Sequence, residues 1–390
     1  MIGLFLDKVE ILMAITKLKP IVKWAGGKEQ ELKYIQPKMP KKFNNYFEPF
    51  VGGGAVYFNI GIEHKKFIND KSDELINLYK SVANEDSDFL EFIEEIIEDW
   101  FYIETYVATH SEKLTNIYSD FFCDLISDIQ LKKLVSDFLI NNHDLYESVL
   151  SKKMNLTSLA FKKEVEKSLP NKMIRMKAIE LKKSRLPETD ILHNIEGAIK
   201  AAYYMHLRNL YNTFDKLNIS KSFYEALFFF IRNYTYSGMF RYNSSGKFNV
   251  PYGGIGYNRK SLNGKLSYMK SKTLISYLKD TEIFNLDFQK FFDETKPNKD
   301  DFIFLDPPYD SEFSTYAKNE FTKDDQMRLA DYLINKCNAK WMIVIKNTPF
   351  IYSLYNSDKL NISSFSKKYL VSFRNRNDKN AEHLLIKNYD

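Results

Sequence analysis

The sequence is poor in cysteine. Its 390 residues include two, Cys123 and Cys337, and these lie far apart, in no spacing that suits a metal site or a redox motif. We therefore expect no metal site. The scarcity of cysteine also fits a reduced, cytoplasmic setting.

Long apolar runs are lacking at the start of the chain. The first residues, MIGLFLDKVEILMA, are apolar but are interrupted by Asp7, Lys8 and Glu10. This pattern suits neither a signal peptide nor a membrane-spanning helix, so no membrane partner is expected. Met13 is an alternative start to Met1.

Charge of one sign is only slightly in excess. The chain has 56 Lys and Arg against 51 Asp and Glu, a net charge of +5. This mild basic balance suits an anionic partner without identifying one. Apolar residues make up 44% of the chain and aromatic residues 15%, which is enough for a full core in one large domain or two ordinary ones.

Glycine and proline are unevenly distributed. Residues 84–230 contain one Gly and two Pro, which predicts a helical block. Residues 231–260 are rich in Tyr, Asn, Gly and Ser, a composition typical of hairpins and loops. Residues 17–83 and 271–390 alternate β-prone runs with helical patterns. We therefore expect one split α/β domain with an insertion at 84–270.

The insertion contains a strongly basic stretch. Residues 151–185 hold eleven Lys or Arg and three Glu, a net charge of +8. Two interpretations stay open. A solvated helix face is the more common outcome for such a stretch, and a contact with nucleic-acid phosphates is the functional alternative.

A glycine-rich turn follows the first β-prone run, in EPFVGGGAVYF, and is expected to lead into a helix. Gly52 and Gly54 would let a ligand approach the backbone. Asp70 ends the next short run, where an acid can bind both hydroxyls of a ribose. Tyr57 replaces the third glycine of a dinucleotide motif, and no P-loop lysine follows. The pattern predicts a nucleoside site without a phosphate cradle, although an ordinary tight turn would use the same glycines.

A second glycine motif, KWAGGK, precedes that turn. Trp24 could stack on a flat ring, and Lys28 could reach an anion. A loop with a buried tryptophan explains the motif equally well.

The strongest chemical signal is FIFLDPPY, where an apolar run ends in Asp306, Pro307, Pro308 and Tyr309. The exocyclic amino group of a base is a poor nucleophile because its lone pair is delocalised into the ring. The Asp306 carboxylate and the Pro307 carbonyl could accept its two N–H bonds and free that lone pair. The prolines fix the backbone in advance, and Tyr309 could stack on a flipped-out base.

A nucleoside-bearing cofactor and an activated amino group together suggest S-adenosylmethionine, whose methyl group is already electrophilic. Alignment and electrostatics would supply most of the rate enhancement. Neither cysteine follows a proline, which argues against the cysteine-dependent methylation of a ring carbon.

The motifs, in this order, resemble the Dam-type (D12 class, alpha-group) DNA adenine-N6 methyltransferases over residues 17–83 and 222–390. The resemblance implies a Rossmann-like S-adenosylmethionine-dependent methyltransferase domain, at 17–83 and 271–390. A mostly helical target-recognition domain carrying a β-hairpin would be inserted at 84–270. The catalytic segment would be Asp306, Pro307, Pro308 and Tyr309. The implied cofactor contacts are Trp24, Lys28, Glu48, Phe50, Gly52, Gly54, Asp70, Asp287, Phe288 and Asp306.

The segment YTYSGMFRYNSSGKFNVPYG resembles the DNA-reading hairpin of that family. Tyr236 matches an aromatic wedge that enters the duplex, and Arg241 matches a reader of guanine, which suits bidentate Arg–guanine geometry. Ser237 and Met239 replace the Asn and Leu of members that read GATC, which argues against GATC as the site. The implied DNA contacts are Tyr236, Ser237, Met239, Arg241, Asn243 and Pro251.

The expected activity is site-specific methyl transfer to N6 of a flipped-out adenine in double-stranded DNA. Two alternatives stay open, a cytosine-N4 DNA methyltransferase and a DNA-binding module that has lost catalysis. Cytosine-N4 enzymes commonly carry Ser where Asp306 stands, and the intact motifs oppose the second alternative. The sequence alone leaves an RNA substrate open. A cognate restriction endonuclease is compatible as a functional partner.

Overall fold

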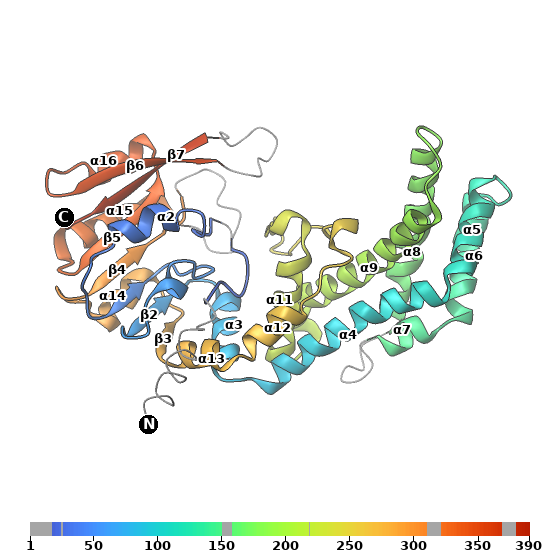
Figure 1. Ribbon diagram of the computed structural model, residues 1–390, viewed down its shortest axis with the longest axis horizontal. Coiled ribbons are helices and arrows are strands. Elements are labelled where there is room, and N and C mark those ends of the chain that lie inside the picture. Colours follow the sequence, from blue (N-terminus) through green and yellow to red (C-terminus); the bar gives the residue numbers. More distant parts are fainter. Residues whose placement is uncertain (1–17, 25, 150–157, 218, 310–320, 369–379) are drawn as a thin grey trace, which may run out of the picture. The chain divides into compact units, whose positions relative to one another are not determined.

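The computed structural model describes residues 18–24, 26–149, 158–217, 219–309, 321–368 and 380–390 (Figure 1). The choice between Met1 and Met13 as the start concerns residues outside this description. The chain divides into two compact units. The α/β unit comprises residues 1–85, 240–246 and 268–390, and the helical unit comprises 86–239 and 247–267.

The α/β unit is built on one seven-stranded sheet in the order β3-β2-β1-β4-β5-β7-β6. β1 to β5 are parallel, and β7 is antiparallel to both of its neighbours. The strands are β1 (Tyr46–Glu48), β2 (Lys66–Asn69), β3 (Thr281–Phe284), β4 (Phe302–Leu305), β5 (Lys340–Lys346), β6 (Asn361–Lys368) and β7 (Asn380–Lys387). The expected split α/β fold is confirmed.

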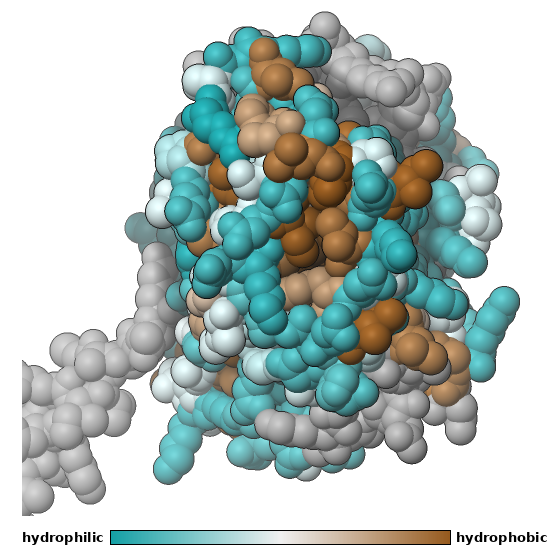
Figure 2. All heavy atoms as spheres, turned by 90° about the vertical axis from the view of Figure 1, so that its right-hand side faces the viewer, coloured by the Kyte–Doolittle hydropathy of each residue, from teal (hydrophilic) through white to brown (hydrophobic). Residues whose placement is uncertain are grey.

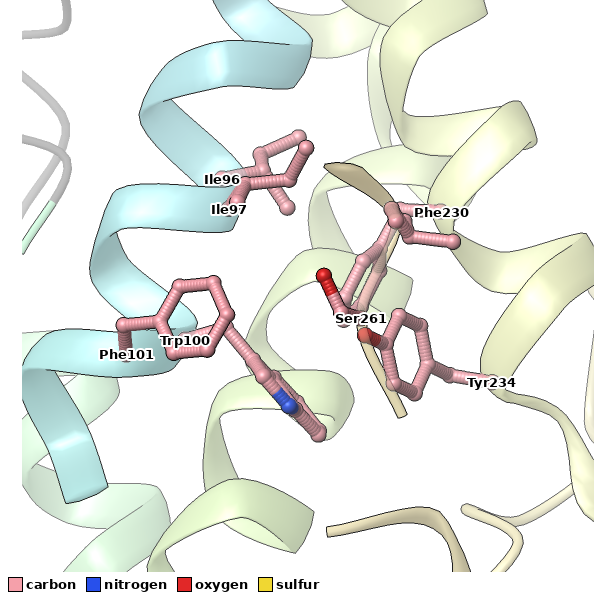
Figure 3. A pocket seen from close by; sticks show the side chains of 8 residues that line it. Ile96, Ile97, Trp100, Phe101, Phe230, Tyr234 and Ser261 are labelled. Atoms are coloured by element: carbon pink, nitrogen blue, oxygen red, sulfur yellow. The ribbon is translucent and has the colours of Figure 1, made fainter. Parts of the chain in front are cut away.

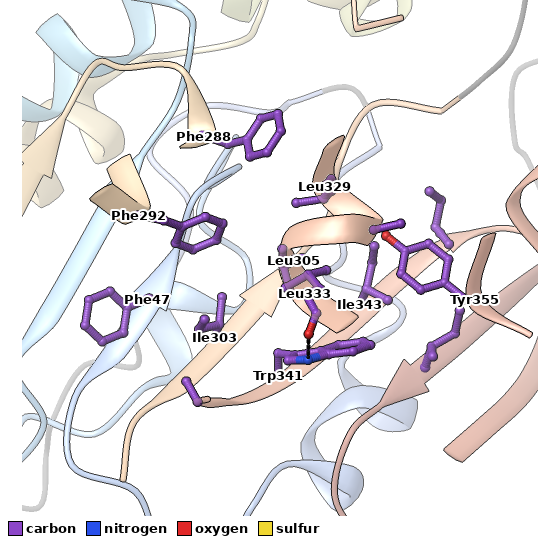
Figure 4. Packing of buried hydrophobic residues seen from close by; sticks show 14 of the residues in the cluster. Phe47, Phe288, Phe292, Ile303, Leu305, Leu329, Leu333, Trp341, Ile343 and Tyr355 are labelled. Carbon is purple, nitrogen blue, oxygen red and sulfur yellow. Dashed lines mark hydrogen bonds between the residues drawn. The ribbon is translucent and has the colours of Figure 1, made fainter. Parts of the chain in front are cut away.

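Apolar runs form the central strands because both faces of the sheet are covered. All four residues of β4 are buried, as are the five central residues of β5. Figure 4 shows the core on one side of these strands, with Phe47, Ile303 and Trp341 among its members. The Trp341 indole is fully buried, and its Nε1 donates to the Leu333 carbonyl at 2.9 Å. The core therefore satisfies its one indole donor.

Side-chain caps fix where several helices of this unit begin. Ser72, Ser271, Asp287, Thr322 and Thr348 each accept a hydrogen bond from the first turn. The helices of the unit include α2 (Leu32–Ile35), α3 (Asp73–Ala83), α13 (Lys272–Lys279), α14 (Phe288–Thr295), α15 (Lys323–Asp331) and α16 (Pro349–Tyr355). A π-turn, η5 (Tyr332–Lys336), continues α15.

One local expectation is wrong. The glycines after β1 do not lead into an α-helix but into a single 3₁₀ turn, η2 (Tyr57–Asn59). Another 3₁₀ turn, η1 (Gln36–Lys38), lies before β1 and follows α2. Six residues separate Gly54 from Gly61. That is too short a segment for a stable α-helix.

The helical unit contains a run of helices between residues 87 and 234, in the region where a helical block is expected. Its first long helix starts at an Asp86 cap, and α6 starts at a capping box of Ser127 and Gln130. The helices are α4 (Ser87–Thr109), α5 (Ser111–Phe122), α6 (Asp128–Asn141), α7 (Asp144–Ser148), α8 (Ser158–Glu180), α9 (Glu188–Asn212), α10 (Phe214–Leu217) and α11 (Lys221–Tyr234). α12 (Asn263–Met269) contains the boundary with the other unit.

α9 is the central element of the helical unit, since α4, α8 and α11 all pack against it. Trp100, Tyr203 and Phe230 meet in this core with ring centroids 5.7 to 6.2 Å apart. Figure 3 shows a small apolar hollow between α4 and α11, lined by residues such as Ile97 and Phe230. Its lining is mostly apolar, with Tyr234 and Ser261 as the residues that carry a hydroxyl, and it holds no charged side chain.

A buried ionic cluster joins α9 to the chain that follows the expected hairpin. The Lys200 ammonium, fully buried, lies 2.7 Å from Glu196 and donates to the Asn258 carbonyl at 2.8 Å. Asn258 in turn accepts from the Tyr252 hydroxyl at 3.0 Å. These bonds fix the segment around η4 (Ile255–Tyr257) on the helices.

The expected hairpin at 231–260 contains an antiparallel bridge between Thr235 and Tyr252. Tyr242 and Phe248 are bridge residues as well. Ser237 has a φ of 53° within the turn η3 (Tyr236–Gly238), which interrupts an extended arm. The backbone of Phe248 and the Val250 carbonyl also bond to side chains of α9.

Candidate active site

Four acids end four neighbouring parallel strands of the sheet. Glu48 is the last residue of β1, Asp70 and Asp306 directly follow β2 and β4, and Asp287 lies three residues after β3. Carboxyl ends of parallel strands share one edge of a sheet. The order reverses between β1 and β4, and ligands of open α/β sheets bind at such a switch point. The fold thus brings these expected site residues to one edge.

Asp306 is held by the lysine of the KWAGGK motif. The Lys28 ammonium lies 2.5 Å from Asp306 Oδ1, although 278 residues separate them. Lys28 is 2% exposed and Asp306 is 18% exposed. The same ammonium donates to the Gly26 carbonyl at 3.0 Å and to the Tyr309 hydroxyl at 3.3 Å. The structure therefore joins the KWAGGK and DPPY motifs, a pairing that the sequence did not indicate.

The buried cation has a clear electrostatic role. It neutralises the carboxylate and fixes Asp306 Oδ1 in place. Lys28 also lies 5.6 Å from the centroid of the Tyr309 ring, which orients that ring. Tyr309 packs edge-on against His383 of β7, with centroids 5.4 Å apart.

Gln326 of α15 fixes the backbone of the same motif. Its Nε2 donates to the Pro308 carbonyl at 2.7 Å, and the side chain is fully buried. The capping box of Thr322 and Asp325 fixes the start of the helix that carries it. The Asp-Pro-Pro turn is therefore constrained by two prolines and by this amide. Sequence reasoning missed Gln326 because nothing in its spacing marks it.

Asp70 organises the glycine turn after β1. Its Oδ2 accepts from the Gly52 N–H and its Oδ1 from the Ser72 N–H, both at 2.9 Å. Burial raises the pKa of Asp70, and the backbone N–H groups of Ser72, Gly52 and Lys71 oppose that rise. A carboxylate can accept about four hydrogen bonds, so a ribose hydroxyl could still donate to Asp70.

The glycines of this turn leave room for the Trp24 side chain. Gly52 has a φ of 50°, and a Cβ there would lie 2.8 Å from Trp24 Cδ1. A Cβ on Gly53 would lie 3.2 Å from Trp24 Cβ. The half-buried indole of Trp24 thus lies on the turn, and Gly54 is packed against Phe58. The KWAGGK motif and the glycine turn form one structure.

Glu48 lies deeper than the other acids. It is 2% exposed, and the Tyr46 hydroxyl donates to its Oε2 at 2.7 Å. Burial raises the pKa of Glu48 well above its usual range, while the bond from Tyr46 opposes the rise. A direct ligand contact is therefore less well supported for Glu48 than for Asp70 or Asp306.

Asp287 and Phe288 begin α14. Asp287 caps that helix and forms an ion pair with Arg328 of α15 at 3.1 Å. The Arg328 guanidinium lies 4.7 Å from the centroid of the Phe288 ring, and the centroids of the Phe50 and Phe288 rings are 5.8 Å apart. Arg328, also missed in the sequence, thus orients the two residues expected to meet the edge of a nucleoside.

The expected DNA contacts gather on the loop between Thr235 and Tyr252. Tyr236 is 50% exposed, and its N–H donates to the Pro251 carbonyl at 2.9 Å. The other expected contacts are Ser237, Arg241, Asn243 and Pro251, which are exposed, and Met239, which is half-buried. Tyr236 to Met239 and Pro251 belong to the helical unit, and Arg241 and Asn243 belong to the α/β unit.

Across the described residues, no cluster of three His, Cys, Asp or Glu side chains could hold a metal ion. Within the same residues, no helix is long and apolar enough to cross a membrane.

A Rossmann-like sheet with acids at its strand ends and an Asp-Pro-Pro-Tyr turn defines a methyltransferase that acts on an amino group. The chain belongs to the D12 class N6 adenine-specific DNA methyltransferases, whose family pattern matches residues 24–186 and 177–371. It is thus an enzyme that methylates adenine N6 in DNA.

Named relatives extend along nearly the whole chain. The type II methyltransferase M.CviBI of Paramecium bursaria Chlorella virus NC1A is 28% identical over 95% of this chain and 100% of its own length. M.MjaIII of Methanocaldococcus jannaschii is 26% identical over 96% and 100%. The DNA adenine methylase of Haemophilus influenzae is 24% identical over 90% and 88%. The helical unit is therefore included in the similarity.

Proposed function

We propose that the methyl donor is S-adenosylmethionine and that it binds along the strand ends from β3 to β4. The observation that carries this proposal is the row of acids at that edge, with Asp70 directly after β2 beside the Gly52 turn. An acidic edge also suits the positive sulfonium of this donor. When bound, it supplies an electrophilic methyl group.

The residues of this chain would divide the work at the donor. Asp70 would hold the ribose, and Asp287 with Phe288 would contact the adenine ring of the donor. Trp24, Phe50 and the Gly52 turn would border the same site. Arg328 supports that edge from α15 because it pairs with Asp287 and lies on Phe288.

The target adenine would be activated by Asp306 and the Pro307 carbonyl. Each would accept one N–H of the exocyclic amino group, which localises the lone pair on N6. The Lys28 ammonium holds Asp306 Oδ1 in place, and Gln326 holds the neighbouring Pro308 carbonyl. Preorganised acceptors of this kind need no rearrangement at the moment of transfer. Tyr309 would stack on the flipped base.

The substrate would be double-stranded DNA, read by the loop around Tyr236 and Arg241. We propose a recognition sequence other than GATC because Ser237 and Met239 depart from GATC-reading members. The names of the type II relatives support a cognate restriction endonuclease as the functional counterpart. A chromosomal substrate would place the enzyme in the cytoplasm.

Isotope labelling tests the donor and the target atom together. Duplex DNA is incubated with the protein and S-adenosylmethionine bearing a deuterated methyl group, and the nucleosides are analysed by mass spectrometry. We expect the label on N6-methyladenine. Label on N4-methylcytosine, or none despite measured cofactor binding, would contradict the proposal.

A further inference from the structure

We propose that the exposed cations of α8 and of the turn after it bind phosphates of duplex DNA beside the recognition site. This inference rests on the proposed function and adds a surface to it. The cations are Lys163, Lys167, Arg175, Lys182 and Lys183, all exposed. Together we call them the α8 basic face.

The acids of α8 all have hydrogen-bond partners inside the helical unit, and the described ion pairs show none of them paired with this face. Glu164 accepts from Asn209 at 3.2 Å. Glu166 accepts from Ser136 at 2.8 Å and pairs with Lys162 at 3.5 Å. Glu180 is 4% exposed and accepts from the Leu186 N–H at 3.0 Å.

Some basic residues of the stretch have internal partners, which separates them from the face. The Lys162 side chain is 17% exposed and pairs with Glu166. Lys177 is 13% exposed and lies 2.6 Å from Asp124. Among the described ion pairs, none includes a member of the α8 basic face. Lys152 and Lys153 of the same stretch lie outside the described residues.

One internal contact brings like charges together. The half-buried Lys172 lies near Arg175. The pKa of Lys172 is lowered mainly by burial and, to a smaller extent, by the positive charge of Arg175. A folded protein with uncompensated neighbouring cations gains by binding an anion there. The charge of DNA complements the whole length of the face.

The first half of α8 and the return arm of the DNA-reading loop share one end of α9. Phe161 packs on Tyr203 of α9 with centroids 5.8 Å apart, and Asn209 bonds to Glu164. Three residues further along α9, Asn212 bonds to Phe248 of the loop at 2.8 and 2.9 Å. The part of α8 that carries Lys163 and Lys167 and the return arm of the loop are therefore both attached to the C-terminal part of α9.

The second half of α8 lies further away. Seventeen residues separate Lys163 from Glu180, which corresponds to about 25 Å of helix. At 3.4 Å per base pair this length spans about seven base pairs. The near cations, Lys163 and Lys167, should thus contact short duplexes, whereas Lys182 and Lys183 should need longer DNA.

Two double variants test this arrangement on the full chain. K163A/K167A removes the near pair and K182A/K183A the far pair. K41A/K299A is the matched control, because these exposed lysines precede β1 and β4 at the opposite edge of the sheet from the strand-end acids. Binding is measured by fluorescence anisotropy over a range of salt, on duplexes of about 12 and about 30 base pairs that hold the methylated site.

Each lost phosphate contact should reduce the log–log salt slope by about 0.9. We expect the near pair to reduce the slope by about 1.8 on both duplexes and the far pair only on the long one. Unchanged slopes for both α8 variants, or an equal change in the control, would overturn the proposal. Formation of N6-methyladenine at saturating DNA is measured in parallel. If the wild type forms no N6-methyladenine, the proposed function is refuted rather than this inference. We expect the α8 variants to methylate the same DNA sequence as the wild type.

Discussion

The two units of this protein place their polar groups differently. In the α/β unit, polar side chains meet at a few points on the strand ends, as when Lys28 joins Asp306 and Tyr309. In the helical unit, the main buried cluster, Lys200 with Glu196 and Asn258, holds helices and a loop together. A catalytic site depends on a few residues in fixed positions, so it can be found in a sequence as short motifs. A surface proposed to bind DNA phosphates has no such motif, and its sequence shows only an excess of positive charge.

The largest expected effect separates the two units most clearly. Asp306→Ala should abolish methyl transfer while the fold persists, because one preorganised acceptor of the amino group is lost. The cost should be at least about 3 kcal/mol of barrier, or roughly 100-fold in rate. Single-turnover transfer at saturating cofactor measures it. Asp324→Ala, an exposed acid on α15, is the control, and a rate for Asp306→Ala within about threefold of that control would refute the assignment.

A comparable effect on stability is expected in the helical unit. Lys200→Met removes the cation that lies 2.7 Å from the buried Glu196 and leaves that acid with Arg259 at 3.7 Å, which should cost about 3 kcal/mol of unfolding free energy. The pair Lys200→Met/Glu196→Leu should recover much of the loss because both charges are removed. Urea denaturation measures both. Equal stability of the wild type and Lys200→Met would show that the cluster does not hold this unit together.

Asp70→Ala should act on the cofactor more than on the chemistry. Loss of a charged acceptor for the ribose should weaken binding by about 2 kcal/mol, roughly 30-fold. The transfer rate at saturating cofactor should change less. Asp70→Asn keeps one acceptor oxygen, so its cofactor affinity should lie between those of the wild type and Asp70→Ala. Calorimetry that finds unchanged affinity in Asp70→Ala would exclude the ribose contact.

The smallest effect concerns the support of the catalytic turn. Gln326→Leu removes the donor to the Pro308 carbonyl, so the rate at saturation should fall by about tenfold, in line with one hydrogen bond. Gln326→Glu should not restore it because a carboxylate cannot donate to that carbonyl. Cofactor affinity is the second readout. A loss confined to affinity, with the rate preserved, would show that Gln326 does not position the turn.

Much of the α/β unit could be predicted from the sequence. The runs around Ile303 and Trp341 are apolar and form β4 and β5, and the short aromatic runs around Phe47 and Phe67 form β1 and β2. Asp70 and Asp306 could be identified because acids at the ends of such runs have a known chemical use. The edge strands β3 and β6 contain polar residues, such as Thr281 and Ser363, and have no comparable signal.

Three features required the structure because they depend on distant parts of the chain. The contact of Lys28 with Asp306 spans 278 residues. Trp24, and not an absent ligand, limits the size of the residue at Gly52. Asn212 of α9 bonds to the backbone of Phe248, 36 residues further along the chain.

The central claim is that the Asp306 turn makes N6-methyladenine while the exposed loop around Arg241 chooses its position. A randomised duplex library, methylated by the wild type and by Arg241→Ala, and sequenced with a method that distinguishes N6-methyladenine from N4-methylcytosine, tests it directly. We expect N6-methyladenine within one short motif for the wild type. Arg241→Ala should give the same modified base in a motif relaxed at one position. Modified cytosine, or an unchanged motif in Arg241→Ala, would contradict the account.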